Sequence, residues 1–545
     1  MHAFRASIVG LIAMFLPLTA TALPVVPGAQ GFGTETVAGR GGAVIVVDTL
    51  APTGEGSLQA CVATPGPRTC VFAVSGTIDI GGQMMIGEPF LTLAGQTAPS
   101  PGVTIRGPVG IRTHDVLIQH LRFRAGDVPE VDAIGITSDP QGEGTFNIVL
   151  DHITASWAND ENISAYPGPP DMAGQPGYTV TDFTLSNSLS SEGLTFAPGH
   201  SMGFLAARPG LLNVSVIGNM FLHNGGRNPK LGNGNFVIAN NLIYNWGSTA
   251  TTMGSQAGVF DGAVIANAWE IGPDVASTGK PPINISTGNP GSNTLYIADN
   301  LFAGEIAGDQ WSLVVVEEAT VAQEPMLPAW LPDLALVDAE ELGATLAQCS
   351  GARPLDRDPV DERVVASYLD GNGSLTDCVE ASSPACSTPE PRTPPGGWPD
   401  LAENTIELDI PADPAGDDDD DGYTNLEEWL HDAAAQVECR GSGVDPTGGD
   451  DGADGSSEGD DGTDPDSTGG DDGGAATSGG GSGGGAATDG GGDSGEGTSV
   501  LTGDGSGGAN DDSADGCGCR QSSAPRGAGL ALMLMLLARR RRQVA

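Results

Sequence analysis

The phrase VLDHITAS, residues 149–156, recurs twice in altered form, as TLSNSLSS at 184–191 and VIGNMFLH at 216–223. Each copy is a short run of β-branched and apolar residues with a His or Asn at the same place: His152, Asn187 and Asn219. Eight residues further on stand Asp160, Thr195 and Arg227. If the copies are successive coils of a solenoid, these three side chains stack on one face. A carboxylate and an arginine on one face indicate chemistry on a polyanion.

Similar phrases, separated by Gly, Asn, Asp and Pro turns, continue from about residue 25 to 310. Their polar residues at the equivalent place are His120, His152, Asn187, Asn219, Asn241, Asn267 and Asn300. A repeat of this length is typical of a solenoid, and a recurrent inward polar residue suggests a stacked hydrogen-bonding ladder. The sequence therefore predicts an all-β protein, a right-handed parallel β-helix. A β-propeller is the rival, but it needs about 40 residues and four strands per blade.

Shifts in composition divide the chain into six expected parts. These are a signal peptide (1–22), the β-helix (23–310), an irregular extension that packs along or past the end of the solenoid (311–410), a calcium-loop segment (411–440), an acidic linker (441–516) and a C-terminal tag (517–545). The first part has a basic residue, an apolar core and small residues before the cut, as secretory signals do. We therefore expect an exported protein.

The charge balance excludes a nucleic-acid partner. The chain carries 70 acidic and 22 basic residues, and 441–516 contains 18 acids with no Lys or Arg. This stretch buries too little apolar surface to fold and is expected to be an extended spacer. The rest of the chain is acidic as well, whereas a binder of phosphate backbones needs a concentrated basic surface.

Eight cysteines in an exported chain predict disulfides rather than a metal or redox site. Cys61 with Cys70, and Cys378 with Cys386, are the simplest local pairs. Cys349 and Cys439 are then left to pair with each other, which the sequence alone does not establish.

The C-terminus combines Cys517 and Cys519 with an apolar run at 528–538 and a cluster of arginines at 539–542. The run is shorter than the roughly 20 residues that cross a bilayer. The arrangement resembles MYXO-CTERM tags. That resemblance implies recognition by sorting machinery at the membrane, processing near the Cys and anchoring at the bacterial cell surface, on the outer membrane. The alternative is an apolar tail without function.

The segment DDDDDGYTNLEE at 417–428 matches a calcium-binding loop. Its candidate ligands stand at loop positions 1, 3, 5, 7, 9 and 12: Asp417, Asp419, Asp421, Tyr423 through its carbonyl, Asn425 and Glu428. Gly422 occupies position 6, where the loop turns sharply. A helix is expected after the loop but not before it, so the segment resembles a single dockerin-like loop. The alternative is a plain acidic run.

Several phrases together closely resemble pectate lyases of polysaccharide lyase family 1, over about residues 26 to 305. They are PGAQGFG (27–33), GEGSLQACV (54–62), GPRTCVFAVSGTI (66–78), LTLAGQTAP (91–99), IQHLRFRAGD (118–127), VLDHITASWANDENIS (149–164) and GGRNPK (225–230). The resemblance implies a parallel β-helix, Ca²⁺ as cofactor and cleavage of polygalacturonate by β-elimination. We expect a monomer acting on an acidic polysaccharide.

The family motifs imply roles for individual residues. Asp132, Asp160 and Glu161 would bind calcium, and Arg227 would be the base. Two adjacent residues of a strand point to opposite faces, so Asp160 and Glu161 can both bind only if a turn lies there. A guanidinium is protonated at ordinary pH, so its use as a base requires an alkaline medium or a dense cationic environment.

Lys230 and His200 are candidate substrate-binding residues. The family pattern often has a further Asp where this chain has Ser164, and a Lys on the coil where this chain has Thr195. These departures put the polymer in question. Solvated turn residues or a structural arginine remain alternative roles for the candidate positions.

Elimination from a uronate requires loss of the proton beside a carboxylate, and a bound divalent cation would stabilise the resulting charge. Two other functions use the same fold. A non-catalytic adhesin would bind acidic glycans in the same groove, and a glycoside hydrolase would need two carboxylates flanking the scissile bond.

Overall fold

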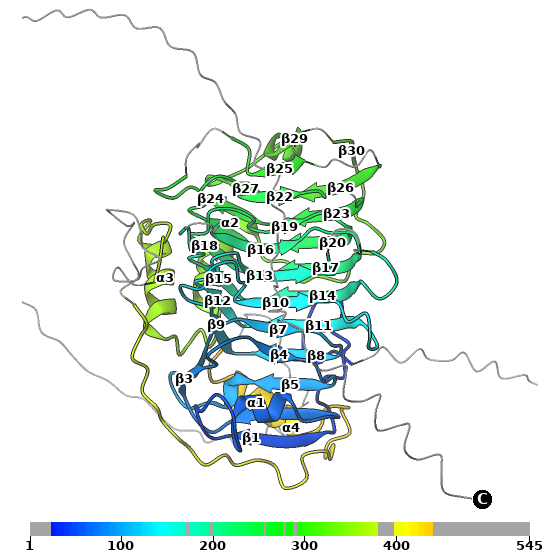
Figure 1. Cartoon of the computed structure of the whole chain (residues 1–545). Helices are drawn as coiled ribbons and strands as arrows, with labels where there is room; N and C mark the ends of the chain where they lie inside the picture. The colour runs from blue at the N-terminus through cyan, green and yellow to red at the C-terminus, as the bar shows by residue number, and fades with distance from the viewer. Residues whose placement is uncertain are drawn as a thin grey trace, which may run out of the picture. The chain divides into compact units, whose positions relative to one another are not determined.

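The structure is a computed structural model that describes residues 23–169, 172, 174–196, 200–255, 258–275, 280–286, 291–317, 319–379 and 397–439. In this part the chain winds through three sheets in turn, and strands from successive coils pair in parallel (Figure 1). Within the sheets, only β27 and β28 pair antiparallel. The predicted all-β, right-handed parallel β-helix is confirmed.

The eleven-stranded sheet contains, in spatial order, β1 (Ala43–Val47), β2 (Arg68–Phe72), β5 (Leu91–Ala94), β8 (Val116–Gln119), β11 (Thr145–Asp151), β14 (Val180–Ser186), β17 (Leu211–Ile217), β20 (Gly234–Ala239), β23 (Phe260–Ile265), β26 (Asn293–Ala298) and β30 (Val321–Gln323). The ten-stranded sheet contains β3 (Gly76–Asp79), β6 (Val103–Arg106), β9 (Leu121–Arg124), β12 (Thr154–Ser156), β15 (Leu189–Ser191), β18 (Met220–Leu222), β21 (Leu242–Tyr244), β24 (Ala268–Glu270), β27 (Leu301–Phe302) and β28 (Glu305–Ile306). The nine-stranded sheet contains β4 (Met84–Ile86), β7 (Val109–Ile111), β10 (Ile134–Thr137), β13 (Glu161–Tyr166), β16 (Met202–Ala206), β19 (Lys230–Leu231), β22 (Thr251–Met253), β25 (Ile283–Ser286) and β29 (Val314–Glu317).

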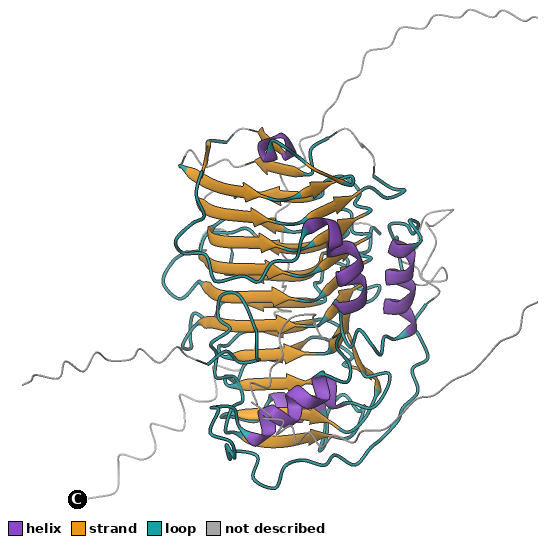
Figure 2. Ribbon diagram, turned by 180° about the vertical axis from the view of Figure 1, so that it is seen from behind, coloured by secondary structure: helices purple, strands orange, loops and turns teal. Residues whose placement is uncertain are grey.

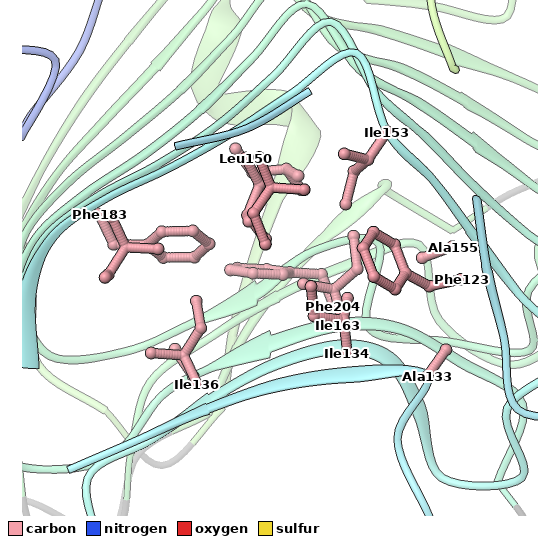
Figure 3. Packing of buried hydrophobic residues seen from close by; sticks show 14 of the residues in the cluster. Phe123, Ala133, Ile134, Ile136, Leu150, Ile153, Ala155, Ile163, Phe183 and Phe204 are labelled. Atoms are coloured by element: carbon pink, nitrogen blue, oxygen red, sulfur yellow. The ribbon is translucent and has the colours of Figure 1, made fainter. Parts of the chain in front are cut away.

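The core lies inside the coils, where apolar residues of consecutive turns stack on one another. Ile134 pairs with Ile163, and Ile163 pairs with Phe204, one coil further on. Figure 3 shows these three side chains meeting Leu150 and Phe183 from the opposite wall. Period-two alternation directs these side chains inward and leaves the residues between them facing out. The stacking therefore fixes the register of the nine-stranded sheet.

The predicted polar ladder exists, but only from Asn219 onward. The side-chain amides of Asn219, Asn241 and Asn267 each donate to the next rung, at 2.9 Å, and the last of these acceptors is Asn300. These rungs also receive backbone N–H groups, so they are fully satisfied inside the turn.

The placement of His120, His152 and Asn187 on the same ladder was wrong by one residue. Asp151 pairs with Ser186, and Ser186 pairs with Ile217, so Asn187 lies opposite Gly218 and not opposite Asn219. Ser188 occupies the ladder position on this coil. Its hydroxyl accepts the backbone N–H of Ile153 at 3.1 Å, and its own N–H donates to Asn219 Oδ1 at 2.8 Å. The loops between coils differ in length, and only strand pairing reveals such a shift.

Four α-helices lie outside the coils in the described part of the chain: α1 (Leu58–Val62), α2 (Ala339–Cys349), α3 (Pro359–Leu369) and α4 (Asn425–Ala434). Two short 3₁₀ segments span Gly95–Thr97 and Gln310–Leu313. Helix α3 begins where a sequence would predict a helix start, since Asp358 caps it and Pro359 fills its first position. None of these helices is long and apolar enough to cross a membrane.

The extension after the β-helix packs along its side, beside the ten-stranded sheet (Figure 2). Leu342 of α2 and Val364 of α3 join Leu189, Met220 and Leu242 in one apolar cluster. Helix α4 covers the beginning of the eleven-stranded sheet, where its Leu426 and Leu430 meet Val71 and Ala94. The C-terminal segments thus cover apolar surface that the coils leave exposed.

The disulfides Cys61–Cys70 and Cys349–Cys439 are both formed, as predicted. Cys378 is also disulfide-bonded, and its expected partner Cys386 lies outside the described residues. The signal peptide, the acidic linker and the tag with Cys517 and Cys519 likewise lie outside the described residues.

Candidate active site

Three carboxylates converge at the amino-terminal ends of β10 and β13, two neighbouring strands inside the nine-stranded sheet. Asp132 precedes β10, Asp160 lies in the bend before β13, and Glu161 is the first residue of β13. One oxygen from each lies within 4.8 Å of the others. The bend supplies the turn that lets Asp160 and Glu161 share one site.

Asp132 is held by donors from the neighbouring coil. The Ser164 hydroxyl donates to Oδ2 at 2.5 Å, and the backbone N–H of Glu161 donates to Oδ1 at 3.1 Å. A Cβ at Gly135 would lie 3.3 Å from both Asp132 Oδ2 and Ser164 Oγ, so the glycine keeps the space beside these oxygens open. Burial and the negative charge of Asp160 raise the pKa of Asp132 to about 6.

Asp160 is paired with His200, one of the two predicted substrate-binding residues. His200 Nδ1 lies 3.1 Å from Asp160 Oδ1, and the imidazole remains partly exposed. Burial favours a higher pKa for Asp160, but the hydrogen bonds from His200 and Glu161 and the charges of His200 and Arg227 outweigh it and lower the pKa.

Glu161 is fully buried, and its carboxylate forms an ion pair with Arg227 through Oε1 and Nη1. Its other oxygen, Oε2, is buried without a hydrogen-bond donor among the described residues. Burial raises the pKa of Glu161 well above its ordinary value, because Arg227 offsets only part of the charge that Asp132 and Asp160 add. Three acids this close need more positive charge than one arginine supplies.

The turn that carries Arg227 is tightly built. Arg227 has φ +53°, in the left-handed region, and its carbonyl accepts the backbone N–H of Phe204 at 2.7 Å. Lys230 follows in β19, between Leu205 of β16 and Thr252 of β22. Arg227 therefore lies in the turn before β19 and Lys230 lies in β19 itself, which belongs to the same sheet as β10 and β13.

Thr195, the middle residue of the predicted stack, does not belong to this group. Its hydroxyl donates to the carboxylate of Asp377, and its backbone N–H donates to the Thr376 carbonyl at 3.0 Å. The loop before β16 is longer than the loops before β13 and β19. The residue eight positions after Asn187 therefore does not reach the place that Asp160 and Arg227 occupy on their own coils.

The sequence interpretation missed the contribution of Ser164, which it treated only as the place of an absent acid. A usable signal was present, because VDAIGI (131–136) and DENISA (160–165) align as consecutive coils. The strands pair in that register, with Gly135 opposite Ser164. Aligning the coils would have placed the Ser164 hydroxyl beside Asp132.

The residues around Asp132, Asp160 and Glu161 fit a hard divalent cation. All available ligand atoms are oxygens, which such cations prefer. A bound cation would give Glu161 Oε2 the partner that it lacks among the described residues, and Gly135 leaves space beside the Asp132 carboxylate.

A second acidic group lies in the predicted calcium loop. Asp417, Asp419 and Asp421 present oxygens within 4.8 Å of one another. The Asp417 carboxylate accepts the Gly422 N–H at 3.0 Å, and that of Asp421 accepts the Tyr423 N–H at 2.8 Å.

Helix α4 follows this loop with a capping box formed by Thr424 and Glu427. Asn425 Oδ1 accepts the Asp418 N–H at 3.1 Å. The pKa of Glu428 is raised by burial and by the charges of Asp419, Asp421 and Asp417, so its carboxyl lies in their field. The structure thus brings oxygens of Asp417, Asp419 and Asp421 together, and Asn425 and Glu428 lie in the first turn of α4.

Comparison with known proteins places the chain among pectate lyases. No protein-family model matches it. It is 32% identical over 434 residues to a probable pectate lyase C of Aspergillus flavus, covering 75% of this chain and 94% of that protein. The corresponding protein of Aspergillus oryzae is 31% identical over the same shares of both chains.

Two solved structures are similar at lower identity. The pectate lyase of Acidovorax avenae subsp. citrulli is 14% identical with a TM-score of 0.43, covering 64% of this chain and 100% of that one. The major allergen of cedar pollen is 16% identical with a TM-score of 0.44, covering 59% and 92%. On the strength of the full-length sequence relatives, this chain belongs to the pectate lyase family.

Proposed function

We propose that this protein is a calcium-dependent, surface-anchored lyase that cleaves polygalacturonate or a related uronate polymer by β-elimination, with Arg227 as the base. The observation that carries the proposal is the ion pair of Arg227 with Glu161, whose carboxylate converges with those of Asp132 and Asp160. The relatives named pectate lyase C support the reaction type.

Asp132, Asp160 and Glu161 would hold the calcium ion. When bound, calcium would neutralise Glu161 and the substrate carboxylate, which favours both a neutral guanidine and loss of the proton beside that carboxylate. Arg227, with a side chain only 19% exposed, sits where water competes little for its protons. Lys230 would bind a neighbouring uronate carboxylate, and His200 would orient Asp160 and meet the sugar.

The crowding of the carboxylates argues against a glycoside hydrolase. A hydrolase needs two carboxyl groups on either side of the glycosidic bond, roughly 5 to 9.5 Å apart. Here the acids converge on each other and on Arg227, which leaves no gap for a sugar between them.

The test is ultraviolet absorbance of polygalacturonate incubated with the purified protein, with calcium or with a chelator. A lyase product carries a conjugated double bond that absorbs, whereas a hydrolase releases reducing ends without it. Growth of absorbance that the chelator stops is expected. Binding of several uronate polymers without any absorbance change would replace the proposal with the adhesin.

A further inference from the structure

The two residues that form the ion pair are each followed in sequence by a buried asparagine. Asn162 follows Glu161, and Asn228 follows Arg227. Their side chains are 0% and 1% exposed, so neither can contact substrate. Asn162 is bonded through one peptide unit to Glu161, and Asn228 is bonded in the same way to Arg227. A shift of either asparagine therefore moves the neighbouring charged side chain.

A third asparagine, Asn224, joins these two. The Asn162 side-chain amide donates to Asn224 Oδ1 at 3.1 Å, and the Asn224 amide donates to Asn228 Oδ1 at 3.2 Å. Asn224 is 1% exposed and is fully engaged, since it also accepts the Gly193 N–H and donates to the Ser190 carbonyl, both at 3.0 Å. A continuous chain of amides thus runs from β13 to the arginine turn.

The surrounding backbone leaves this chain little freedom. Asn228 is fixed to the next coil, because its N–H donates to the Ala250 carbonyl at 2.9 Å and its carbonyl accepts the Thr251 hydroxyl at 2.7 Å. On the other side, a Cβ at Gly203 would lie 2.4 Å from Asn228 Oδ1. The arginine turn is therefore pressed against β16, and Asn224 sets how far it stands from β13.

We propose that Asn224 is a positioning residue, which fixes the separation of Arg227 from Glu161 by bridging Asn162 and Asn228 behind them. This inference rests on the proposed role of Arg227. A buried, satisfied polar network holds one geometry, because any other arrangement leaves polar atoms unpaired. Loss of the bridge frees the arginine turn to move against the carboxylates.

The test compares Asn224→Ala with Asn241→Ala in the complete protein. Asn241 is a matched control, since it is also fully buried and bonded to two other asparagines, but it lies in the ladder and contacts none of the site residues. Both substitutions should lower the unfolding temperature. Only Asn224→Ala should lower kcat, by about a hundredfold, with KM unchanged, at a temperature where both variants remain folded.

The positioning role has a second signature. In an Arg227→Lys background, Asn224→Ala should cause little further loss, because the arginine it positions is gone. Equal kcat for Asn224→Ala and Asn241→Ala, or a full additional loss in the Arg227→Lys background, would overturn the inference. If Asn224→Ala does not fold, Asn162→Ala removes the other half of the bridge and should show the same kcat loss.

An inactive wild-type protein would refute the proposed function without deciding this inference, so crystal structures of both alanine variants supply an independent measurement. The Arg227 guanidinium should leave the Glu161 carboxylate in Asn224→Ala and stay on it in Asn241→Ala. An undisturbed ion pair in Asn224→Ala would reject the positioning role whatever the substrate is.

Discussion

Two buried charge clusters of this β-helix have opposite balance. On the ten-stranded sheet, Arg122 and Arg124 of β9 meet Asp358 and Asp361 at the start of α3, and Arg124 bonds both acids at 2.6 and 2.7 Å. At the active site, three acids face Arg227 and the partly exposed His200, and an oxygen of Glu161 has no donor among the described residues. Both clusters are buried, yet only the first is neutral and satisfied.

This difference separates a structural cluster from a functional one. The paired cluster joins the extension to the coils and raises the pKa of Arg124, chiefly because the two aspartates outweigh the effect of burial. The unbalanced cluster stores unfavourable repulsion that a bound cation can relieve.

The largest effect is expected at Arg227. Arg227→Ala should reduce the lyase rate by roughly 10³-fold or more, because the base is removed. Arg227→Lys, which keeps a positive charge beside Glu161, should also be slow but should bind calcium like the wild type. Both are measured by ultraviolet absorbance and by calorimetric calcium titration. An active Arg227→Ala would show that another group is the base.

At Arg124 we expect a loss of stability without a loss of activity. Arg124→Ala leaves two buried aspartates with Arg122 as their remaining arginine partner. It should lower the free energy of unfolding by about 3 to 5 kcal/mol, as measured by denaturant titration. Its activity per folded molecule should not change.

The matched control is Asp79→Ala, which breaks the exposed pair of Asp79 with Arg106. It should cost at most about 1 kcal/mol. Similar losses for the buried and the exposed pair would contradict the structural role assigned to the Arg124 cluster.

A third buried charge makes stability depend on pH. The charges of Glu438 and Asp151 outweigh burial and raise the pKa of His152 to about 9, with Asp151 Oδ2 3.0 Å from Nδ1. The charged imidazole is favoured in the folded state, so its contribution is complete below the unfolded pKa of about 6.5 and is lost as pH rises to about 9.

The contribution is roughly 3 kcal/mol. His152→Gln should therefore flatten the stability profile between pH 6 and 9, measured by chemical denaturation. Burial lowers the pKa of the stacked neighbour His120, so its contribution to the pH dependence of stability has the opposite sign to that of His152. An unchanged slope in the variant would show that His152 is not the titrating group.

The smallest effect is expected in the calcium loop. Asp421→Asn should remove one calcium-binding event in calorimetry and lower the unfolding temperature slightly in calcium, since α4 packs on the eleven-stranded sheet. Lyase activity should remain. Asp160→Asn should instead lose activity and keep the loop's binding event, and loss of activity in both variants would mean that the two acidic groups are coupled.

The repeat of phrases such as VLDHITAS predicted the β-helix because stacked coils need apolar residues at period two, which the sequence displays directly. It did not predict the whole register. His152 lies opposite Asn187 as expected, but Asn187 lies opposite Gly218 and not opposite Asn219. The family motifs predicted Asp132, Asp160, Glu161 and Arg227 as a group, and the structure brings them together. The Ser164 contact and the amide bridge through Asn224 were not predicted.

The sequence alone determined the fold class, the local cysteine pair Cys61–Cys70 and the residues that carry charge, because local patterning and chemistry are written in residue order. Only the tertiary structure decided which charges meet. Arg124 finds Asp358 and Asp361 across more than 230 residues of chain, whereas Glu161 lies beside two further acids and pairs with Arg227. Whether a charge is balanced depends on which groups lie near it in space, and folding determines those distances.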